Sequence, residues 1–404
     1  MSIQDKFSKL GTDNAPGQEV RQQSSDLNTL LRGETLPGVP VDFSHGDVDA
    51  FTPTPGAFEI FADGVRRGGQ QAYTEYRGAS RIREELAGKL AAFTGAPVDA
   101  ANGMILTPGT QGALFLAVAS TVTRGDKVAI VQPDYFANRK LVEFFEGEIV
   151  PVRLDYMKSD AAAGLDLDQL EDAFRQGAKV FVFSNPNNPA GVVYSEAEIR
   201  RIADLANIYG ATVIADQLYS RLRYTDVAYA HLRATGINPA NVITIMGPSK
   251  TESLSGYRLG VAFGAPKLIE RMEKLQAIVS LRAAGYNQAV LQTWFSEPGN
   301  WMDERIRLHQ AIRDDLLKVL RAADGVEARA PQAGSYLFPR LPELAVAPPD
   351  FVRILRLQAG VIVTPGTEFG PHSANSVRLN FSQDHAAAVN AVERLVELVG
   401  RYRA

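Results

Sequence analysis

Short, continuously apolar runs are the feature that most constrains how this 404-residue chain can fold. Runs of this kind, without polar alternation, are typical of strands buried on both faces of a parallel sheet. Helix-like segments such as 196–209 lie between them, and alternation of strands with helices predicts a doubly wound, mostly parallel α/β domain. The four runs are K-V-A-I-V (127–131), K-V-F-V-F (179–183), A-T-V-I-A-D (211–216) and V-I-T-I-M (242–246).

The pattern starts near residue 80 and changes near residue 300. Apolar spacing predicts a helix over 81–93, and M-I-L-T (104–107) predicts a strand followed by a turn and a helix. After a long helix at 301–320, shorter strands and helices predict a smaller α+β domain. These are G-S-Y-L-F (334–338), a helix near 350–358, G-V-I-V-T-P (360–365), V-R-L-N-F (377–381) and a closing helix. We therefore expect three parts: 1–60, an N-terminal arm with part of the small domain; 61–298, the large domain; and 299–404, the small domain.

Charge and composition exclude several classes of function. The chain has 42 Lys and Arg against 46 Asp and Glu and no long basic run, which argues against nucleic acid or an anionic membrane as the main partner. It has no cysteine, and its five histidines lack metal-ligand spacing, so we expect neither disulfides nor a metal site. No signal-peptide pattern and no apolar run of roughly 18 residues occurs, which predicts a cytoplasmic protein.

The segment G-P-S-K-T-E-S-L-S-G-Y-R-L-G (247–260) carries the strongest chemical signal. The amine of Lys250 can form a Schiff base with an aldehyde. The hydroxyl of Ser249 and the guanidinium of Arg258 suit a phosphate. An aldehyde and a phosphate on one ligand describe pyridoxal phosphate (PLP), although a surface loop with a solvated lysine is the plain alternative.

Other motifs supply what PLP requires from a protein: an anion cradle and a carboxylate for the pyridine nitrogen. T-P-G-T-Q-G-A (107–113) reads as a strand-to-helix turn, whose free N–H groups bind phosphate. Asp216 ends an apolar run, and Asn188 lies in the rigid turn S-N-P-N-N-P-A-G (184–191). Each has a structural alternative: a tight turn, a capping aspartate and an Asn-Pro turn.

In this order the motifs resemble those of the class I/II PLP-dependent aminotransferases, the aspartate aminotransferase superfamily of PLP fold type I. The resemblance spans roughly residues 40–385 and includes Y-T-x-x-x-G at Tyr73, Q-P-D-Y-F at Tyr135, D-x-x-Y at Tyr219 and V-R-L-N-F at Arg378. Spacings of 28 residues from Asn188 to Asp216 and 34 from Asp216 to Lys250 agree with it.

The resemblance implies a role for each matched residue. Lys250 would hold PLP as an internal aldimine, and Lys250, Asp216 and Tyr219 would be the catalytic residues. Tyr219 and Asn188 would donate to the phenolic oxygen of PLP, and Tyr135 would stack on its ring. The substrate would contact Arg378, which clamps its α-carboxylate, together with Asn188 and Gly46. Tyr73 would reach the cofactor of a neighbouring subunit, which implies a homodimer with shared sites. The phosphate would lie against Gly109, Thr110, Gln111, Ser249 and Arg258.

The implied activity is transfer of an amino group from an L-amino acid to a 2-oxo acid by a ping-pong mechanism, with Lys250 carrying the proton. Two positions depart from the family. Gly247 stands where serine is common, and Gln111 where one subgroup has a lysine that grips an acidic substrate. Arg282 or Arg139 could replace that lysine. Tyr135, Tyr286 and Tyr336 are further candidates to lie near the substrate.

The fold also hosts other chemistry, so a β-lyase or a decarboxylase stays an alternative. A non-catalytic PLP-binding regulator is a third class, in which a basic DNA-binding module precedes the aminotransferase-like domain. Residues 1–60 have four Lys and Arg against nine Asp and Glu, which disfavours it.

Overall fold

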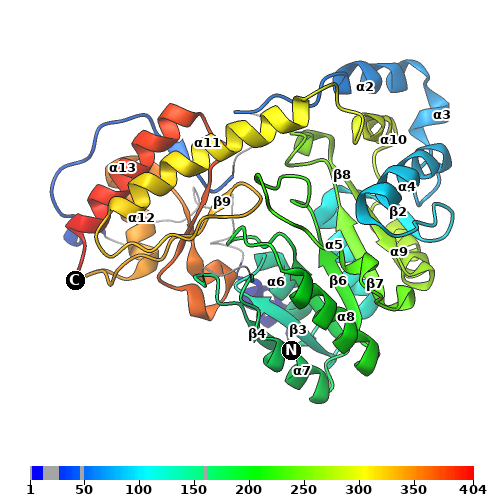
Figure 1. The fold of residues 1–404 in the computed structure, drawn as a ribbon, viewed down its shortest axis with the longest axis horizontal. Helices are drawn as coiled ribbons and strands as arrows, with labels where there is room; N and C mark the ends of the chain where they lie inside the picture. Colours follow the sequence, from blue (N-terminus) through cyan, green and yellow to red (C-terminus); the bar gives the residue numbers. More distant parts are fainter. Residues whose placement is uncertain (1, 12–26, 46–49, 159–161) are drawn as a thin grey trace.

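The computed structural model describes residues 2–11, 27–45, 50–158 and 162–404. Figure 1 shows a larger part built around a sheet and a smaller part, with the long helix α11 (Trp301–Ala322) running between them. The smaller part packs α11, α12 (Pro348–Ala359) and α13 (His385–Arg401) together with short strands. The predicted α/β architecture is therefore confirmed.

The large sheet, within the described residues, has seven strands in the order β2-β8-β7-β6-β5-β3-β4. Strands β4, β3, β5, β6 and β7 pair in parallel, whereas β8 is antiparallel to both its neighbours, β7 and β2. All four apolar runs form strands of this sheet. The bounds are β2 (Met104–Pro108), β3 (Lys127–Gln132), β4 (Glu148–Arg153), β5 (Val180–Ser184), β6 (Thr212–Asp216), β7 (Val242–Met246) and β8 (Leu259–Gly264).

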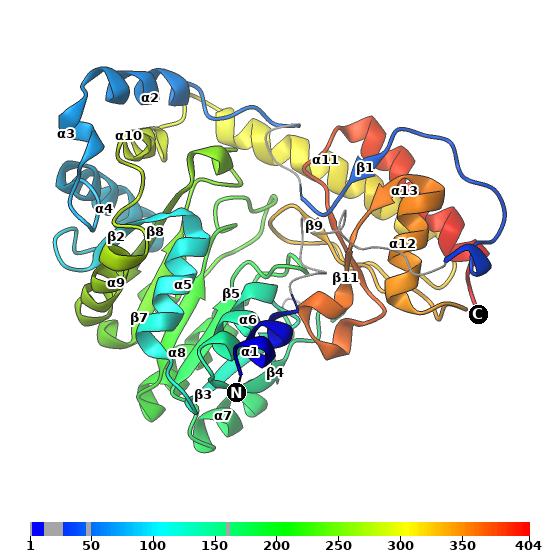
Figure 2. The same cartoon turned by 180° about the vertical axis from the view of Figure 1, so that it is seen from behind.

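Helices cover both faces of the sheet, as Figures 1 and 2 show. Along β5, Val180 and Val182 join the core beneath α5 (Gly109–Thr121), α6 (Phe136–Phe144) and α9 (Pro266–Val279). Phe181 and Phe183 point the other way, into the core beneath α7 (Leu167–Arg175) and α8 (Glu196–Tyr209). Because side chains alternate across a strand, both faces are buried only if every position is apolar, which explains the continuous runs.

Two strands escape that pattern. Strand β4 lies at the sheet edge and contains Pro151. Of its residues only Val152 is buried, so its sequence is not continuously apolar. Strand β8 contains Gly260, where a Cβ would lie 2.3 Å from the carbonyl carbon of Gly109. Glycine is required there because β8 passes directly against the start of α5.

The remaining helices lie mostly along the first 100 residues, with one further short turn. They are α1 (Ile3–Leu10), α2 (Ala57–Arg66), α3 (Gly69–Ala72), α4 (Ser80–Thr94) and α10 (Gly285–Gln288). Helix α4 matches the predicted 81–93 within two residues. In the described residues, no helix is long and apolar enough to cross a membrane, and no group of three or more His, Asp or Glu side chains is placed to hold a metal ion.

The small part contains two short sheets. Strands β11 (Thr364–Pro365), β12 (Val377–Asn380) and β9 (Tyr336–Leu337) form one of them, and β1 (Val41–Asp42) pairs with β10 (Val361–Ile362) in the other. Val41, Phe43 and Phe51 share a core with side chains of α11, α12 and α13. The N-terminal segment thus packs with the C-terminal one, while the exact division at residues 60 and 298 stays a prediction.

Candidate active site

A cavity of about 250 Å³ lies at the carboxyl ends of β5 and β6, where side chains of β9 and β12 also reach. This is the edge at which ligands bind in open α/β sheets. Ten of the predicted site residues line it: Thr110, Gln111, Tyr135, Asn188, Asp216, Tyr219, Ser249, Lys250, Arg258 and Arg378.

One end of the cavity is suited to an anion. Helix α5 begins at Gly109, so the first N–H groups of that helix have no intrahelical partner. The backbone of Gly109 has φ +74°, and a Cβ there would lie 2.4 Å from Nη2 of Arg258. Glycine therefore allows the guanidinium to lie against the helix start. Arg258 itself has φ +52° and donates from Nη1 to the carbonyl of Ser255 at 3.0 Å.

The departure at Gly247 has a local explanation. A Cβ at this position would lie 2.8 Å from Cγ2 of Thr110, closer than real Cβ contacts come. Thr110 therefore occupies the space that a serine side chain at position 247 would need. Thr110 and Ser249 supply the hydroxyl groups of this corner instead.

Asp216 presents a buried carboxylate at the end of β6. Its side chain is 9% exposed, and one oxygen accepts a hydrogen bond from the N–H of Leu218 at 3.0 Å. Burial raises the pKa of this carboxyl group to about 6, and no described cation pairs with it. A protonated pyridine nitrogen is the kind of partner that would stabilise the ionised form.

Arg378 presents an incomplete hydrogen-bonding fork. Nη1 donates to Oδ1 of Asn188 at 3.1 Å, and Nη2 donates to the carbonyl of Ser44 at 2.8 Å. Nε is buried and has no partner among the described residues. Buried N–H groups are nearly always paired, so this one points to a ligand. A carboxylate, bound bidentately by Nε and one Nη, would satisfy it.

Tyrosine hydroxyls line the rest of the cavity. Tyr135 donates to Oε1 of Gln111 at 2.9 Å, and Tyr219 donates to the hydroxyl of Tyr336 at 2.6 Å. Lys250 is half-buried and lines the same cavity. The amine, the carboxylate, the anion corner and the guanidinium fork therefore meet in one cavity, and they fit the groups of PLP and an amino acid.

Other candidates lie elsewhere. Tyr73 is 78% exposed, and its ring stacks with the guanidinium of Arg282 at 4.7 Å. Arg139 interacts with Glu143 and the carbonyl of Glu368, and neither Arg139, Arg282 nor Tyr286 lines the cavity. Gly46 falls outside the described residues.

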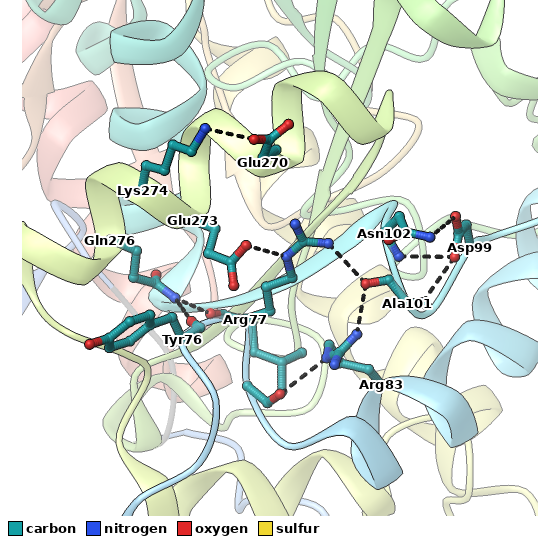
Figure 3. Close-up of polar contacts among 12 residues, drawn as sticks. Tyr76, Arg77, Arg83, Asp99, Ala101, Asn102, Glu270, Glu273, Lys274 and Gln276 are labelled. Carbon is teal, nitrogen blue, oxygen red and sulfur yellow. Dashed lines mark hydrogen bonds and ion pairs between the residues drawn. The ribbon is translucent and has the colours of Figure 1, made fainter.

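The segment that carries Tyr73 is anchored to the large part by a polar cluster (Figure 3). Arg77 pairs with Glu273 of α9 at 2.6 Å and donates to the carbonyl of Ala101 at 2.9 Å. Gln276 of α9 donates to the carbonyl of Tyr76 at 2.6 Å. The segment directly after Tyr73 is therefore fixed by hydrogen bonds, although Tyr73 itself is exposed.

Sequence reasoning missed several lining residues, among them Ser44, His45, Ser184 and Asn380. Ser184 carries a recognisable signal, since it is the polar residue that ends an apolar run directly before the Asn-Pro turn. The other three come from the small part, and their place in the cavity depends on how the two parts pack.

Comparison with known proteins agrees with this geometry. Residues 41–395 match the family model described as aminotransferase class I and II. A crystal structure of an aspartate aminotransferase from Rhodobacter sphaeroides is 71% identical with a TM-score of 0.96, covering 100% of both chains. The aspartate aminotransferase of Sulfolobus acidocaldarius is 27% identical over 89% of this chain and 90% of its own. The aspartate/prephenate aminotransferase of Thermus thermophilus is 27% identical over 96% and 95%.

The chain belongs to the class I and II aminotransferase family, whose members are in general PLP-dependent. It is an aminotransferase, an enzyme that moves an amino group from an amino acid to a 2-oxo acid. Transamination therefore takes precedence over the lyase, decarboxylase and regulator alternatives.

Proposed function

We propose that the cavity binds PLP and that the enzyme transaminates a dicarboxylic amino acid, with aspartate as the amino donor. The observation that carries the proposal is that Lys250, Asp216 and Arg378 line the same cavity. The 71% identity to an aspartate aminotransferase supports the choice of substrate.

Each residue then has a defined task. When bound, the cofactor supplies the aldehyde that carries the amino group and a ring that accepts electrons. Lys250 would hold the aldehyde and, once the amino group of the substrate has displaced it, its freed Nζ would take the proton from the α-carbon and return it as an acid. Asp216 keeps the pyridine nitrogen protonated, and Arg378 orients the α-carboxylate. Nδ2 of Asn188 would donate to the phenolic oxygen, and Tyr219 would do so once its hydroxyl proton turns away from Tyr336.

Among the described residues of one chain, the cavity lining offers no further Lys or Arg for the second carboxylate. Its Lys and Arg lining residues are Lys250, Arg258 and Arg378, and the proposed tasks occupy all three. We place the missing cation on a second copy of the chain. Arg282 is stacked on Tyr73, so a homodimer in which Tyr73 enters the neighbouring cavity brings Arg282 with it.

The surface around Tyr73 has the character of such an interface. Tyr73, Tyr76 and Leu281 are 78%, 43% and 50% exposed, and Arg282 lies within 5.5 Å of both tyrosine rings. Exposed apolar groups gathered with an arginine are typical of protein–protein interfaces.

The proposal is tested with PLP-loaded protein and a panel of aspartate, glutamate, alanine and phenylalanine. Aspartate should convert the pyridoxal absorbance band to the pyridoxamine band, and 2-oxoglutarate should restore it. Arg282→Ala should raise KM for aspartate about tenfold and leave KM for alanine unchanged, since an ion pair to a ligand is lost. Arg200→Ala, on the exposed side of α8, is the matched control. Release of ammonia or carbon dioxide without the pyridoxamine form would refute transamination.

A further inference from the structure

A chain of hydrogen bonds leads from a carboxylate behind the cavity to the substrate-binding arginine. The hydroxyl of Ser184 donates to Oδ1 of Asp134, and the N–H of Asn188 donates to the hydroxyl of Ser184 at 3.1 Å. Oδ1 of Asn188 in turn accepts from Nη1 of Arg378 at 3.1 Å. All four side chains are buried, with exposed fractions of 2% to 7%.

The same carboxylate also holds the backbone on both sides of the cavity floor. Asp134 accepts from the N–H of Tyr135 at 2.6 Å and from the N–H of Ser184 at 2.9 Å. A second link runs parallel to it, from Nδ2 of Asn187 to the carbonyl of Pro133 at 3.1 Å. The end of β3 and the turn after β5 are therefore locked to one another at the level of the cavity.

Burial of the Asp134 carboxylate at this position is energetically unfavourable. No described cation forms an ion pair with it, so its oxygens depend on three N–H and O–H donors. Burial raises the pKa of its carboxyl group to about 8. Asp134 does not line the cavity, whereas Tyr135, Ser184 and Asn188 do. Its contacts therefore reach a ligand only through these neighbours.

We infer that Asp134 and Ser184 are positioning residues that hold Asn188, and through it the guanidinium of Arg378, in the geometry that binds the substrate carboxylate. The inference rests on the proposed function, since it assigns Arg378 to that carboxylate. Its effect is expected mainly in substrate binding, because Ser184 holds the backbone of Asn188, and Asn188 accepts from Nη1 of Arg378. The chemistry at Lys250 should change less, because Lys250 is not part of this chain of hydrogen bonds.

A double-mutant cycle separates this from two independent structural roles. Ser184→Ala removes the middle link, and Asp134→Asn keeps the shape of the side chain but sets an NH2 group against a donor. The probe is maleate, a dicarboxylate, titrated by calorimetry into the PLP-loaded protein, together with KM and kcat for the amino donor. Thr244→Val is the control, because it removes a buried hydroxyl of the same sheet that has no partner among the described residues.

Each single variant should weaken maleate binding about tenfold, as expected when a buried donor is left unpaired. KM should rise by a similar factor, with a smaller change in kcat. The double variant should match the weaker-binding single variant within about twofold, since both cut one chain. Thr244→Val should bind as the wild type does.

Effects that multiply in the double variant, or a Ser184→Ala protein that binds maleate like the wild type, would overturn the inference. If Asp134→Asn does not fold, a crystal structure of Ser184→Ala decides: an unchanged Asn188–Arg378 contact overturns it, and a displaced Asn188 supports it. Failure of the proposed function has a different signature, because the wild type itself would then neither bind maleate nor transaminate aspartate.

Discussion

The cavity wall and the surface around Tyr73 differ in how far one chain completes them. In the wall, Arg378, Asn188 and Asp216 are buried and come from β12, the turn after β5 and the end of β6. On the surface, Tyr73 is 78% exposed, although the segment behind it is firmly bonded through Arg77. On the proposed assignment, one copy of the chain builds a place for PLP and one carboxylate. The groups around Tyr73 are presented outward, where a second copy can use them.

The largest effect is expected for Lys250→Ala, a substitution within the cavity wall. Transamination should fall about 10⁴-fold, because the variant loses both the attaching amine and the proton carrier. The rate of amino transfer is measured at saturating PLP, and borohydride reduction followed by mass spectrometry locates the covalent adduct. The wild type should carry the adduct on Lys250. An adduct on another lysine with full activity would contradict the assignment, and the exposed Lys274→Ala serves as control.

The second test addresses Asp216, whose carboxyl group pairs with no cation among the described residues. Burial raises the pKa of its carboxyl group from the ordinary 3.8 to about 6, so the native state holds the proton more tightly. Its contribution to stability is therefore lost as the pH rises from about 4 to about 6. In protein without PLP, the free energy of unfolding of Asp216→Asn should rise relative to that of the wild type over this pH range, by up to about 3 kcal/mol. Chemical denaturation at several pH values measures this.

With PLP bound, the difference in stability between the two proteins should shift in favour of the wild type. A pyridinium partner stabilises the ionised Asp216, so the wild type should gain more stability from PLP than the variant does, and turnover of the variant should fall about 10²-fold. Equal stabilisation of both proteins by PLP would show that the carboxylate does not meet the pyridine nitrogen. Measuring loaded and unloaded forms side by side provides the control, since the other described carboxyl groups with a raised pKa, Asp134 and Glu252, are common to both.

The parts of the fold that the sequence predicts are those where burial leaves a pattern along the chain. Strand β5 is apolar at successive positions because helices cover both of its faces. Strand β4 at the edge and the glycine-interrupted β8 lack that pattern, so they were not predicted. Patterns of this kind report burial and do not report which strands are neighbours.

The site shows the same limit. Lys250, Asp216 and Arg378 were identified from local motifs and their resemblance to a family, and the structure brings them to one cavity. The role of Asp134 was not predicted from the sequence, because it depends on a contact with Ser184, 50 residues away, and on the pairing of β3 with β5 in the sheet. Strand order is set by packing of the whole domain, so a contact of this kind has no signature in either segment alone.

The smallest effect is expected for a substitution of Tyr73, and it tests most directly whether the surface around Tyr73 serves the cavity of a second copy. Tyr73→Phe should weaken PLP binding about tenfold if its hydroxyl donates to the phosphate in the neighbouring cavity, since hydrogen bonds to charged groups are the strong ones. Tyr76→Phe, also on the stacked arginine, is the matched control and should bind PLP as the wild type does. Equilibrium titration of unloaded protein with PLP measures both.

A mixed dimer then decides which chain Tyr73 serves. When Tyr73→Phe and Lys250→Ala chains are combined, a hybrid dimer has one cavity with Lys250 from one copy and Tyr73 from the other. That cavity should bind PLP with wild-type affinity and be active, although each parent homodimer is defective. A hybrid that keeps the weakened PLP binding would place the action of Tyr73 in its own chain, and the outward face would then lose its role in the site.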